Sequence, residues 1–407
     1  MLDLIKTRKS VSESEPTGEF LTFLAERYYV IRNIDRMPPF LVSVISSADH
    51  WLFISSTGGL TAGRVSADSA LFPYVPVDKV HESTLHTGSK TVLRVGADQG
   101  QRVWEPFNRE HDGRYVVSRN LYKTVSGDKL CFEEVNHDLQ LAFRYTWATS
   151  DEFGFCRRCG LSNLGKQQVA IELLDGLQNI LPANMPMDIQ TRASNLVDAY
   201  KWTEFDEDTG LAIYALYSSI PDQAEPSESL RANTVFCLGL DQSVSLISSA
   251  QLDGFRTGQA IQPEFRTRGI RGAYFVNASL DLTPGGEQCW QMIANIEQSQ
   301  ADVVALQDQL RDPARVAIAI DDSVADGTNE LARIMASTDA LQLTAEENVS
   351  AHHYANVLFN NLRGGIFDDQ NNVLAKNFAN FVFQRNRVVF DAHSDLFGKL
   401  PAKIDFE

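Results

Sequence analysis

The sequence contains no apolar run of the roughly 20 residues that a helix needs to cross a membrane. The apolar stretch within residues 1–10 is too short for a secretory signal peptide. Only five cysteines are present, an odd number, and they lie in segments with the pattern of strands. This usage is typical of small buried apolar residues in a reducing compartment. Together these absences predict a soluble cytoplasmic protein.

Basic residues are outnumbered, with 36 Lys and Arg against 53 Asp and Glu, which gives a formal net charge of −17. The basic residues are also scattered rather than clustered. Nucleic acids and anionic membranes are therefore not expected as partners, because both attract basic patches. An acidic excess of this kind is more typical of a surface that keeps a protein soluble than of a binding site.

Several motifs that carry chemistry are missing, so neither a cofactor nor a metal is expected. The Gly-rich residues 55–64 lack the Gly-Lys-Ser/Thr ending of a phosphate-binding loop and are predicted to form a tight turn between strands. Cys156 and Cys159 would need two more Cys or His ligands at matching spacing to hold zinc, and none lies nearby. His352 and His353 lack the spacing of a zinc protease.

The alternation of apolar and polar residues is what the sequence has in abundance. Apolar residues occupy every second position of residues 139–147, and side chains on a strand point alternately to opposite faces. A second apolar run covers residues 153–161. A third, residues 169–173, follows a turn sequence and is expected to pair with the second run across that short connection. Because no helix-length pattern intervenes, antiparallel pairing is predicted.

About fifteen such strand segments at short spacing precede residue 298 and predict a large antiparallel sandwich. One short amphipathic helix is predicted over residues 18–28, where the apolar residues have helical spacing. From residue 298 helical spacing prevails, with helices expected over residues 303–310, 324–335 and 346–362. The predicted fold is therefore mainly β, with a β domain at 1–297 and a smaller helical region at 298–407.

Six residues are candidates for a carbohydrate-binding site, and no residue is a candidate for catalysis. Residues 104–107 and 119–123 combine aromatic rings with planar polar groups, as sugar-binding sites do. Packing in a core or at a sheet edge would select the same residue types. Glu133 and His137 share one face of a predicted strand. This Glu–His pair could occupy a cleft, or the two side chains could simply be solvated. The candidates are Trp104, Glu105, Arg119, Tyr122, Glu133 and His137.

Several stretches resemble the N-terminal region of cellobiose phosphorylase and related glycoside phosphorylases and hydrolases. They are residues 143–163, with an aromatic strand followed by Phe-Gly, Arg and Leu-x-Asn, and residues 174–182 and 222–228. Residues 356–367 resemble the entry to the helical barrel of these proteins. The resemblance implies a β-supersandwich, similar to galactose mutarotase, followed by linker helices. In that group the catalytic acid lies on an (α/α)6 barrel.

The hundred or so residues after the sandwich cannot hold a barrel of twelve helices, so no catalytic residue is carried over. The implied role is that of the non-catalytic N-terminal part of a carbohydrate-active enzyme resembling inverting glycoside phosphorylases, which cleave glycosidic bonds with phosphate. Its partners would be a downstream helical catalytic domain, an oligosaccharide and a second copy in a homodimer. The alternatives are a stand-alone carbohydrate-binding module and an aldose epimerase that uses Glu133 and His137.

Overall fold

The computed structural model of the chain describes residues 15–23, 25–96, 102–192, 194–218, 230–241, 243–363 and 372–405. Two of the segments that carry the family resemblance, residues 222–228 and the end of residues 356–367, lie wholly or partly outside this range. The chain divides into two compact units, one up to Thr328 and one from Asn329. Each unit is described by itself.

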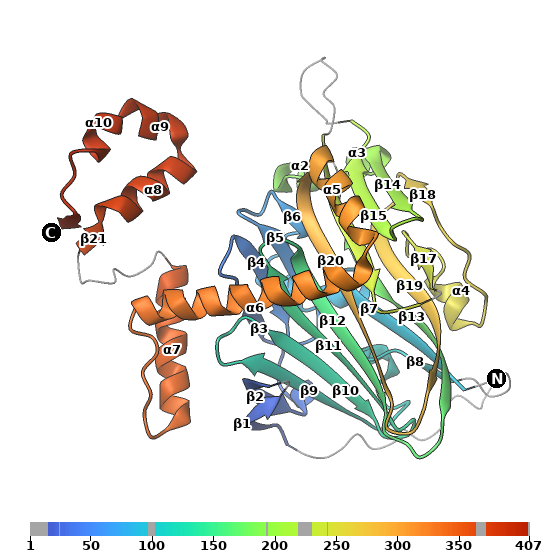
Figure 1. The fold of residues 1–407 in the computed structure, drawn as a ribbon. Coiled ribbons are helices and arrows are strands. Elements are labelled where there is room, and N and C mark those ends of the chain that lie inside the picture. Colours follow the sequence, from blue (N-terminus) through green and yellow to red (C-terminus); the bar gives the residue numbers. More distant parts are fainter. Residues whose placement is uncertain are drawn as a thin grey trace. The chain divides into compact units, whose positions relative to one another are not determined.

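The first unit is built around an eleven-stranded sheet, which confirms the prediction of a mainly β fold (Figure 1). Neighbouring strands of this sheet run antiparallel throughout the described residues. In spatial order the strands are β1 (Thr17–Phe23), β2 (Glu26–Arg32), β9 (Val117–Thr124), β10 (Leu130–Asn136), β11 (Leu141–Ser150), β12 (Gly154–Asn163), β20 (Glu287–Ser299), β16 (Arg231–Leu238), β15 (Leu211–Leu216), β14 (Lys201–Asp206) and β18 (Arg266–Arg268).

Two smaller antiparallel sheets pack against one face of the large sheet, which is here called its inner face. The five-stranded sheet has the order β17 (Val244–Leu246), β19 (Gly272–Leu282), β13 (Val169–Ile180), β7 (Gly88–Val95) and β8 (Arg102–Trp104). The four-stranded sheet has the order β3 (Leu41–Val44), β4 (His50–Ser55), β5 (Leu60–Arg64) and β6 (Ala70–Phe72). The predicted turn within the Gly-rich residues 55–64 is present at residues 56–59, between β4 and β5.

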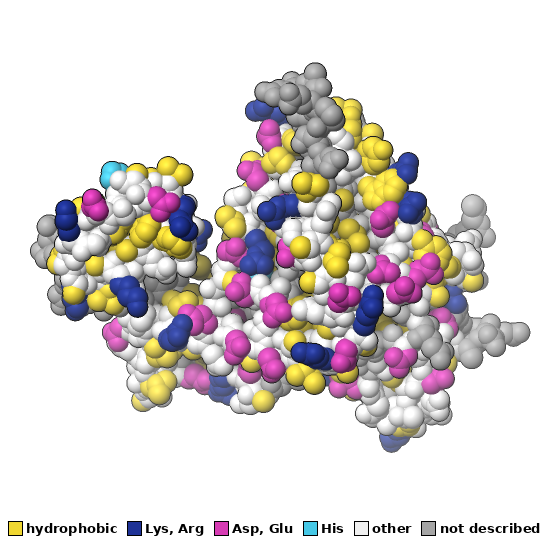
Figure 2. Space-filling model, turned by 45° about the horizontal axis from the view of Figure 1, so that its top comes forward, with side chains coloured by type: hydrophobic (Ala, Val, Ile, Leu, Met, Phe, Trp, Pro, Cys, Tyr) yellow, Lys and Arg dark blue, Asp and Glu magenta, His cyan; other side chains and the backbone are white. Residues whose placement is uncertain are grey.

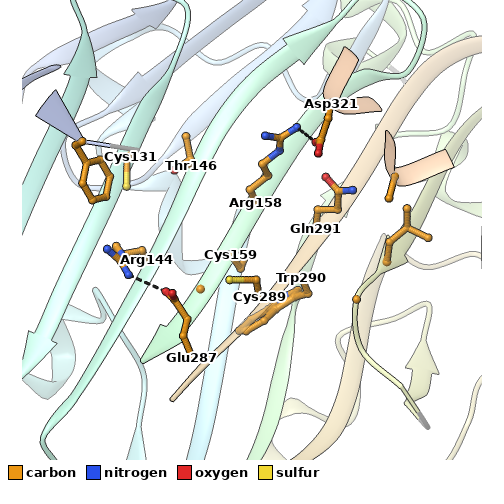
Figure 3. A pocket seen from close by; sticks show the side chains of 15 residues that line it. Cys131, Arg144, Thr146, Arg158, Cys159, Glu287, Cys289, Trp290, Gln291 and Asp321 are labelled. Carbon is orange, nitrogen blue, oxygen red and sulfur yellow. Dashed lines mark hydrogen bonds and ion pairs between the residues drawn. The ribbon is translucent and has the colours of Figure 1, made fainter. Parts of the chain in front are cut away.

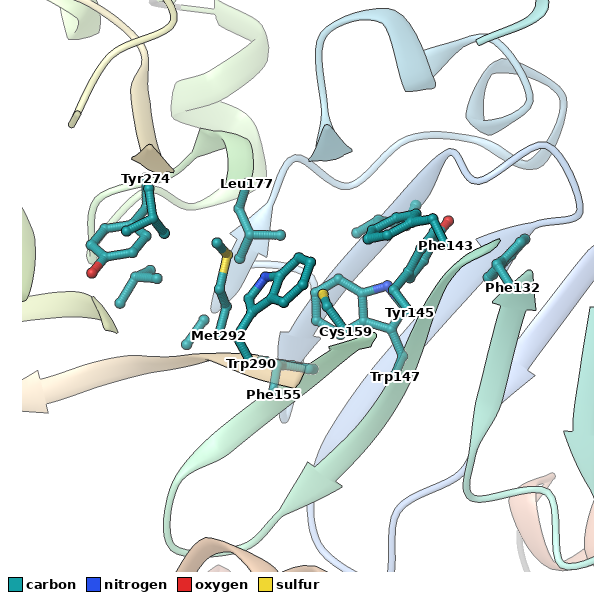
Figure 4. Close-up of a cluster of buried hydrophobic side chains, with 14 of the residues drawn as sticks. Phe132, Phe143, Tyr145, Trp147, Phe155, Cys159, Leu177, Tyr274, Trp290 and Met292 are labelled. Carbon is teal, nitrogen blue, oxygen red and sulfur yellow. The ribbon is translucent and has the colours of Figure 1, made fainter. Parts of the chain in front are cut away.

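The core lies between these sheets and is rich in aromatic side chains (Figure 4). Phe143, Tyr145 and Trp147 of β11 point into it at every second position, as the alternation of the sequence predicts. Phe132 and Tyr145 stack with ring centroids 5.0 Å apart. Burial of such rings is the main stabilising contribution, since apolar area removed from water contributes roughly 25 cal/mol per Å².

Helices cover part of the opposite, outer face of the large sheet. Helix α5 (Gln300–Leu310) begins with a capping box formed by Ser299 and Asp302, and ends before Pro313, the first residue of α6 (Pro313–Ser337). Val316, Ile320 and Val324 recur every four residues on α6, so they form one stripe, and they pack on Cys156 and Ile293 of the sheet. The rest of the outer face near α6 is open.

The remaining helices are short or belong to the second unit. In the first unit they are α1 (Val77–Val80), α2 (Met187–Arg192), α3 (Ser194–Tyr200) and α4 (Leu252–Arg256), with 3-10 turns η1 (Ile34–Arg36), η2 (Ser83–Leu85) and η3 (Arg109–His111). In the second unit they are α7 (Glu347–Leu362), α8 (Ala375–Arg385), α9 (Arg387–Ala392) and α10 (Ser394–Phe397), with the small strands β21 (Asn372–Leu374) and β22 (Lys403–Asp405). The prediction of a helix over residues 346–362 is confirmed by α7.

The prediction of a helix over residues 18–28 is wrong, because this segment forms the hairpin of β1 and β2. Leu21 and Phe23 are two residues apart and therefore share one face of β1, where they pack on Tyr28 and Val30 of β2. Ala25 has a positive φ of 64° in the tight turn. The apolar residues fit helical spacing as well, but pairing with β9 and burial against Tyr122 favour the strand.

The predicted pairing of residues 153–161 with residues 169–173 is also wrong. β12 pairs with β11 and β20 in the large sheet, whereas β13 pairs with β7 and β19 in the five-stranded sheet. Residues 164–168 therefore carry the chain from one layer of the sandwich to the other. A short turn sequence gives no information on whether the next strand returns beside the last one or crosses to the facing sheet.

Candidate functional site: a groove on the outer face

The outer face of the large sheet carries an open groove of about 480 Å³ beside α6 (Figure 3). Its side chains come from the strands β10, β11, β12, β20 and β16, from the end of β1 and from α6. We call it the outer-face groove. The residues that line it include Phe23, Arg144, Thr146, Arg158, Gly160, Leu238, Glu287, Cys289, Gln291 and Asp321.

An ion pair crosses three strands at one side of the outer-face groove. Arg144 of β11 donates to Glu287 of β20 over 2.7 Å, and Ser162 of β12 donates to the same carboxylate oxygen over 3.0 Å. Gly160 lies between the two outer strands, and a Cβ atom there would come within 2.9 Å of the Glu287 carboxylate. The missing side chain at residue 160 therefore lets Arg144 and Glu287 meet across β12.

A second ion pair joins Arg158 of β12 to Asp321 of α6 (Figure 3). The Arg158 Nε atom is buried and has no hydrogen-bond partner among the described residues, although the guanidinium end is partly exposed. Thr146 and Gln291, from the strands on either side, add a hydroxyl and an amide to the lining. The groove thus presents several planar or hydroxylic polar groups on a rigid sheet.

Apolar surface complements these polar groups. The guanidinium of Arg144 lies over the ring of Phe23, 5.5 Å from its centroid; Tyr122 stacks on that ring at 4.9 Å, and Tyr28 packs against it edge-on at 5.6 Å. Leu238 and Cys289 line the groove from β16 and β20. A ring held between an arginine and a tyrosine keeps its orientation, so the groove combines a fixed aromatic group with planar hydrogen-bonding groups.

The electrostatics of the outer-face groove keep its arginine charged. Burial alone would lower the pKa of Arg144, but the charge of Glu287 and the hydrogen bond to it raise that pKa above its ordinary value. Burial raises the pKa of the nearby Cys289 thiol, and the charge of Glu287 acts in the same direction. Cys289 is therefore a neutral thiol rather than an activated nucleophile.

Two of the six residues predicted from the sequence lie beside the outer-face groove. Tyr122 and Asn120 of β9 both donate to Glu133 of β10, over 2.9 Å and 2.8 Å. Glu133 faces Arg144 across the β10–β11 pair, and Tyr122 stacks on Phe23. The structure therefore places Tyr122 and Glu133 in a polar band that continues the groove across the outer face.

His137 lies on the same face as Glu133 but has a different partner, the Ser118 hydroxyl, at 2.8 Å. Four residues of extended strand span about 13 Å, so Glu133 and His137 cannot share a hydrogen bond. The shared face that the alternation predicts is present, whereas the direct Glu–His pair that an epimerase would need is not formed.

Trp104 and Arg119 lie on the inner face, where both donate to Glu134, over 2.7 Å in each case. Glu134 also accepts from the backbone N–H of Phe107, and its side chain is 1% exposed. These three side chains form a buried network that ties β8 and the following loop to the large sheet. The sequence identified two of its members but not the carboxylate that joins them.

Glu105 is also buried and is bound by two cations. Its carboxylate contacts Lys90 at 2.9 Å and Arg256 at 2.7 Å. Burial raises the pKa of Glu105, but hydrogen bonding to Arg256 and the charge of Lys90 outweigh burial, so that the pKa falls to about 2. Glu105 therefore anchors α4 to β7 as a permanent carboxylate.

The sequence did not predict that Arg144, Arg158, Glu287 and Gln291 belong to a site. A signal was present for Arg144, because polar residues between the apolar positions of β11 mark the face that points away from the core. No such signal places Glu287 beside it, since the two residues are 143 positions apart in the sequence. Figure 2 shows acidic, basic and hydrophobic side chains interspersed over the face that it presents.

The Cys156–Cys159 pair has no geometry for a shared metal. The residues are three apart on β12, so their side chains point to opposite faces: Cys156 packs under α6 and Cys159 packs in the inner core. All five cysteines are free thiols. In the described residues no group of three or more His, Cys, Asp and Glu side chains could hold a metal ion, and no helix has the length and hydrophobicity that crossing a membrane would need.

No family model and no curated protein matches the sequence. Solved structures similar to the chain include a bacterial glucoamylase in complex with acarbose, at 9% identity and a TM-score of 0.41, covering 74% of this chain and 39% of that one. They also include a protein described as a kojibiose phosphorylase from the human microbiome, at 10% identity and a TM-score of 0.30, covering 61% of this chain and 28% of that one.

A protein described as an aldose 1-epimerase of Klebsiella pneumoniae is similar at 10% identity and a TM-score of 0.35, covering 73% of this chain and 91% of that one. These structures come from carbohydrate-active enzymes and include the classes that the sequence resembles, a glycoside phosphorylase and an aldose epimerase. The chain spans well under half of the glucoamylase and of the phosphorylase, so the similarity concerns only a part of each of these proteins.

Proposed function

We propose that this chain is the non-catalytic sandwich part of a carbohydrate-active enzyme, and that its outer-face groove binds a segment of carbohydrate. Glycosidic bond cleavage would take place in a helical catalytic domain outside this chain, which the sandwich (residues 1–297) and the helical region (residues 298–407) would support. The free cysteines support a location in the cytoplasm, where thiols stay reduced.

The observation that carries the proposal is the combination of an oriented ring with planar polar groups in one open groove. Sugars present an apolar face of C–H groups and an edge of hydroxyls, and proteins bind them with aromatic rings and planar hydrogen-bonding side chains. Phe23 supplies the edge of an apolar ring, since Arg144 and Tyr122 cover its faces, while Arg144, Glu287 and Gln291 supply the planar groups on neighbouring strands. The volume of about 480 Å³ is in the range of small-molecule sites.

The groove suits binding better than proton transfer. A glycosidase needs one carboxylic acid that holds a proton and a second carboxylate placed opposite it. The two carboxylates of the outer-face groove, Glu287 and Asp321, are each engaged by an arginine. Both carboxylates are therefore engaged in ion pairs, which supports a role in recognition rather than in proton transfer.

Calorimetric titration of the chain with maltotriose, cellotriose and kojibiose tests the proposal. We expect saturable binding of at least one of them, weakened about tenfold or more by Arg144→Ala, since hydrogen bonds to a charged group contribute about 1.5–3 kcal/mol. Arg266→Ala is the matched control, because Arg266 also pairs with a glutamate, Glu204, at 3.1 Å, but lies outside the groove on β18. Absence of saturable binding to all three sugars would contradict the proposal.

The stand-alone binding module and the aldose epimerase give different results in the same preparation. A module would bind sugar without any partner domain, whereas an epimerase would speed the change in optical rotation of fresh α-glucose. The separate partners of Glu133 and His137 give no support to the epimerase, so we expect no rate above buffer in polarimetry.

A further inference from the structure

A second, smaller cavity lies on the other side of β11 from the outer-face groove. Arg144 and Thr146 point to the outer face, so Tyr145 between them points inward, and it lines this cavity together with residues of β7 and of the loop after β8. The cavity has a volume of about 110 Å³. We call it the inner pocket.

The hydroxyl group of Tyr145 reaches the inner pocket without a partner. The side chain is 4% exposed, and the hydroxyl makes no hydrogen bond with any residue that the structure describes. Gly58, in the turn between β4 and β5, approaches it so closely that a Cβ atom there would lie 3.3 Å from the hydroxyl oxygen. Gly58 has a φ of +93°, a conformation that favours glycine.

The hydroxyl of Ser89 on β7 is a second unpaired group at the inner pocket. Its oxygen is buried and has no hydrogen-bond partner among the described residues. A buried polar group without a partner costs about 1–3 kcal/mol, so the Ser89 hydroxyl requires an explanation, while the Tyr145 hydroxyl faces the accessible space of the same pocket. Both are hydroxyls, which can donate and accept at once.

Three charged side chains line the inner pocket: Lys90, which is neutralised by an ion pair, and the exposed neighbours Arg109 and Glu110, whose charges are opposite. The Lys90 ammonium contacts Glu105 at 2.9 Å, and Glu105 also pairs with Arg256. An anion would compete with Glu105 for Lys90, whereas a neutral ligand would not. Phe107, with a positive φ of 64° in the loop after β8, gives the pocket an apolar wall beside Tyr145, 5.3 Å between ring centroids.

We propose that the inner pocket binds the hydroxyl-bearing edge of a neutral polyhydroxylated molecule, with the hydroxyls of Tyr145 and Ser89 exchanging hydrogen bonds with it. A volume of about 110 Å³ is somewhat smaller than the 150 Å³ of an engineered cavity that holds benzene. It therefore accepts a ligand of glycerol size, or one edge of a monosaccharide. This site goes beyond the proposed function, because it lies on the opposite face of β11 from the outer-face groove.

Titration with D-glucose and with glycerol, followed by ligand-observed NMR, tests the proposal and separates the two sources of the same hydroxyl chemistry. We expect saturable binding of at least one probe to the unaltered chain. Tyr145→Phe and Ser89→Ala should each weaken it roughly threefold to tenfold, as the loss of one hydrogen bond does. Arg266→Ala, which lies outside both the outer-face groove and the inner pocket, should leave this binding unchanged.

Thermal unfolding of the same variants shows whether a loss of binding is caused by a loss of folding. Tyr145→Phe removes an oxygen that has no partner in the unliganded chain, so the thermal unfolding temperature without ligand should stay the same or rise. If neither probe binds saturably, or if binding is unaffected by both substitutions, the inner pocket holds only water and the proposal is overturned. Loss of oligosaccharide binding on Arg144→Ala alone would concern the outer-face groove and not this pocket.

Discussion

The two faces of the large sheet use the same kind of ion pair for different ends. On the inner face Arg157 of β12 and Asp175 of β13 form a bidentate pair at 2.7 and 3.0 Å, and both side chains are fully buried. On the outer face Arg144 and Glu287 pair at 2.7 Å, with side chains 25% and 41% exposed. The shortest distance is the same in both pairs, but the inner pair is bidentate and fully buried, whereas the outer pair is a single, partly exposed contact.

The buried pair is also the better connected. Asp175 accepts further hydrogen bonds from Thr91 over 2.6 Å and from the Trp290 indole over 2.7 Å, so its carboxylate joins two facing sheets. Arg157 lies 4.9 Å from the centroid of the Tyr145 ring. A charge removed from water has no replacement partner if one member is lost, whereas water replaces a lost partner on the outer face. The inner-face pair therefore contributes more to stability than the outer-face pair, which is accessible to a ligand in the outer-face groove.

The largest effect is expected for Asp175→Asn, which keeps the shape of the side chain but leaves the Arg157 guanidinium buried without its counter-charge. We expect the free energy of unfolding to fall by about 3–5 kcal/mol. Urea unfolding followed by tryptophan fluorescence measures it. A loss below about 1 kcal/mol would show that burial does not distinguish the two faces.

An acid-sensitive element on the inner side is His50 of β4, whose ring packs against Phe155, 5.1 Å between centroids. Burial lowers the pKa of His50 to about 4 from an ordinary 6.5, and the charge of Arg64 lowers it further. Between pH 6.5 and 4 the unfolded chain therefore binds a proton that the folded chain does not. Stability falls as the pH falls, by about 3 kcal/mol in total.

Urea unfolding of the unaltered chain and of His50→Gln at pH 7 and at pH 4.5 isolates this contribution. The variant should lose less stability than the unaltered chain between the two pH values. An identical loss in both proteins would mean that His50 takes up its proton equally well in the folded state.

A somewhat smaller effect is expected for Glu134→Gln. The substitution weakens the charge-assisted hydrogen bonds from Arg119 and Trp104 but keeps their geometry. We expect a loss of about 2–3 kcal/mol in the free energy of unfolding. Glu133→Gln, one residue along the strand on the outer face, is the matched control and should cost less than about 1 kcal/mol. Equal losses for both would contradict the assignment of the two faces.

The smallest effect is expected for Glu287→Gln, which breaks the exposed ion pair with Arg144. Exposed ion pairs contribute about 0–1 kcal/mol, so thermal unfolding should change little. A double-mutant cycle with Arg144→Ala measures the coupling between the two residues directly. A coupling above about 2 kcal/mol would show that the outer-face pair serves stability as well.

The sequence predicted the layers of this molecule better than their pairing. Alternation along β11 assigned Tyr145 to the core and Arg144 to the opposite face, because a strand can present its residues in only one way. It could not show that β12 lies between β11 and β20, since β20 is distant in the sequence and pairing depends on which strands meet. The prediction of a helix over residues 18–28 was wrong for the same reason, because the strand β2 is favoured by pairing with β9, which is distant in the sequence.

The candidate site was predictable only in part. Tyr122 and Glu133 were identified from their chemistry, and the structure places them beside the outer-face groove. Trp104 and Glu105 also combine an aromatic ring with a polar group, but both are buried. A sequence does not distinguish a polar group that binds a ligand from one that is bound within the protein's own core. Gly160 leaves room for the Glu287 carboxylate, and this role of the glycine can be recognised only once β11 and β20 are known to flank β12.

The most direct test of the account is a calorimetric titration of oligosaccharides onto Arg144→Ala and Arg266→Ala side by side. Both substitutions remove an arginine from an exposed ion pair of the large sheet, but only one of these pairs lies in the outer-face groove. We predict saturable binding that Arg144→Ala weakens about tenfold or more and Arg266→Ala leaves intact. Equal binding by the two variants, or no binding by the unaltered chain, would contradict a carbohydrate site on the outer face.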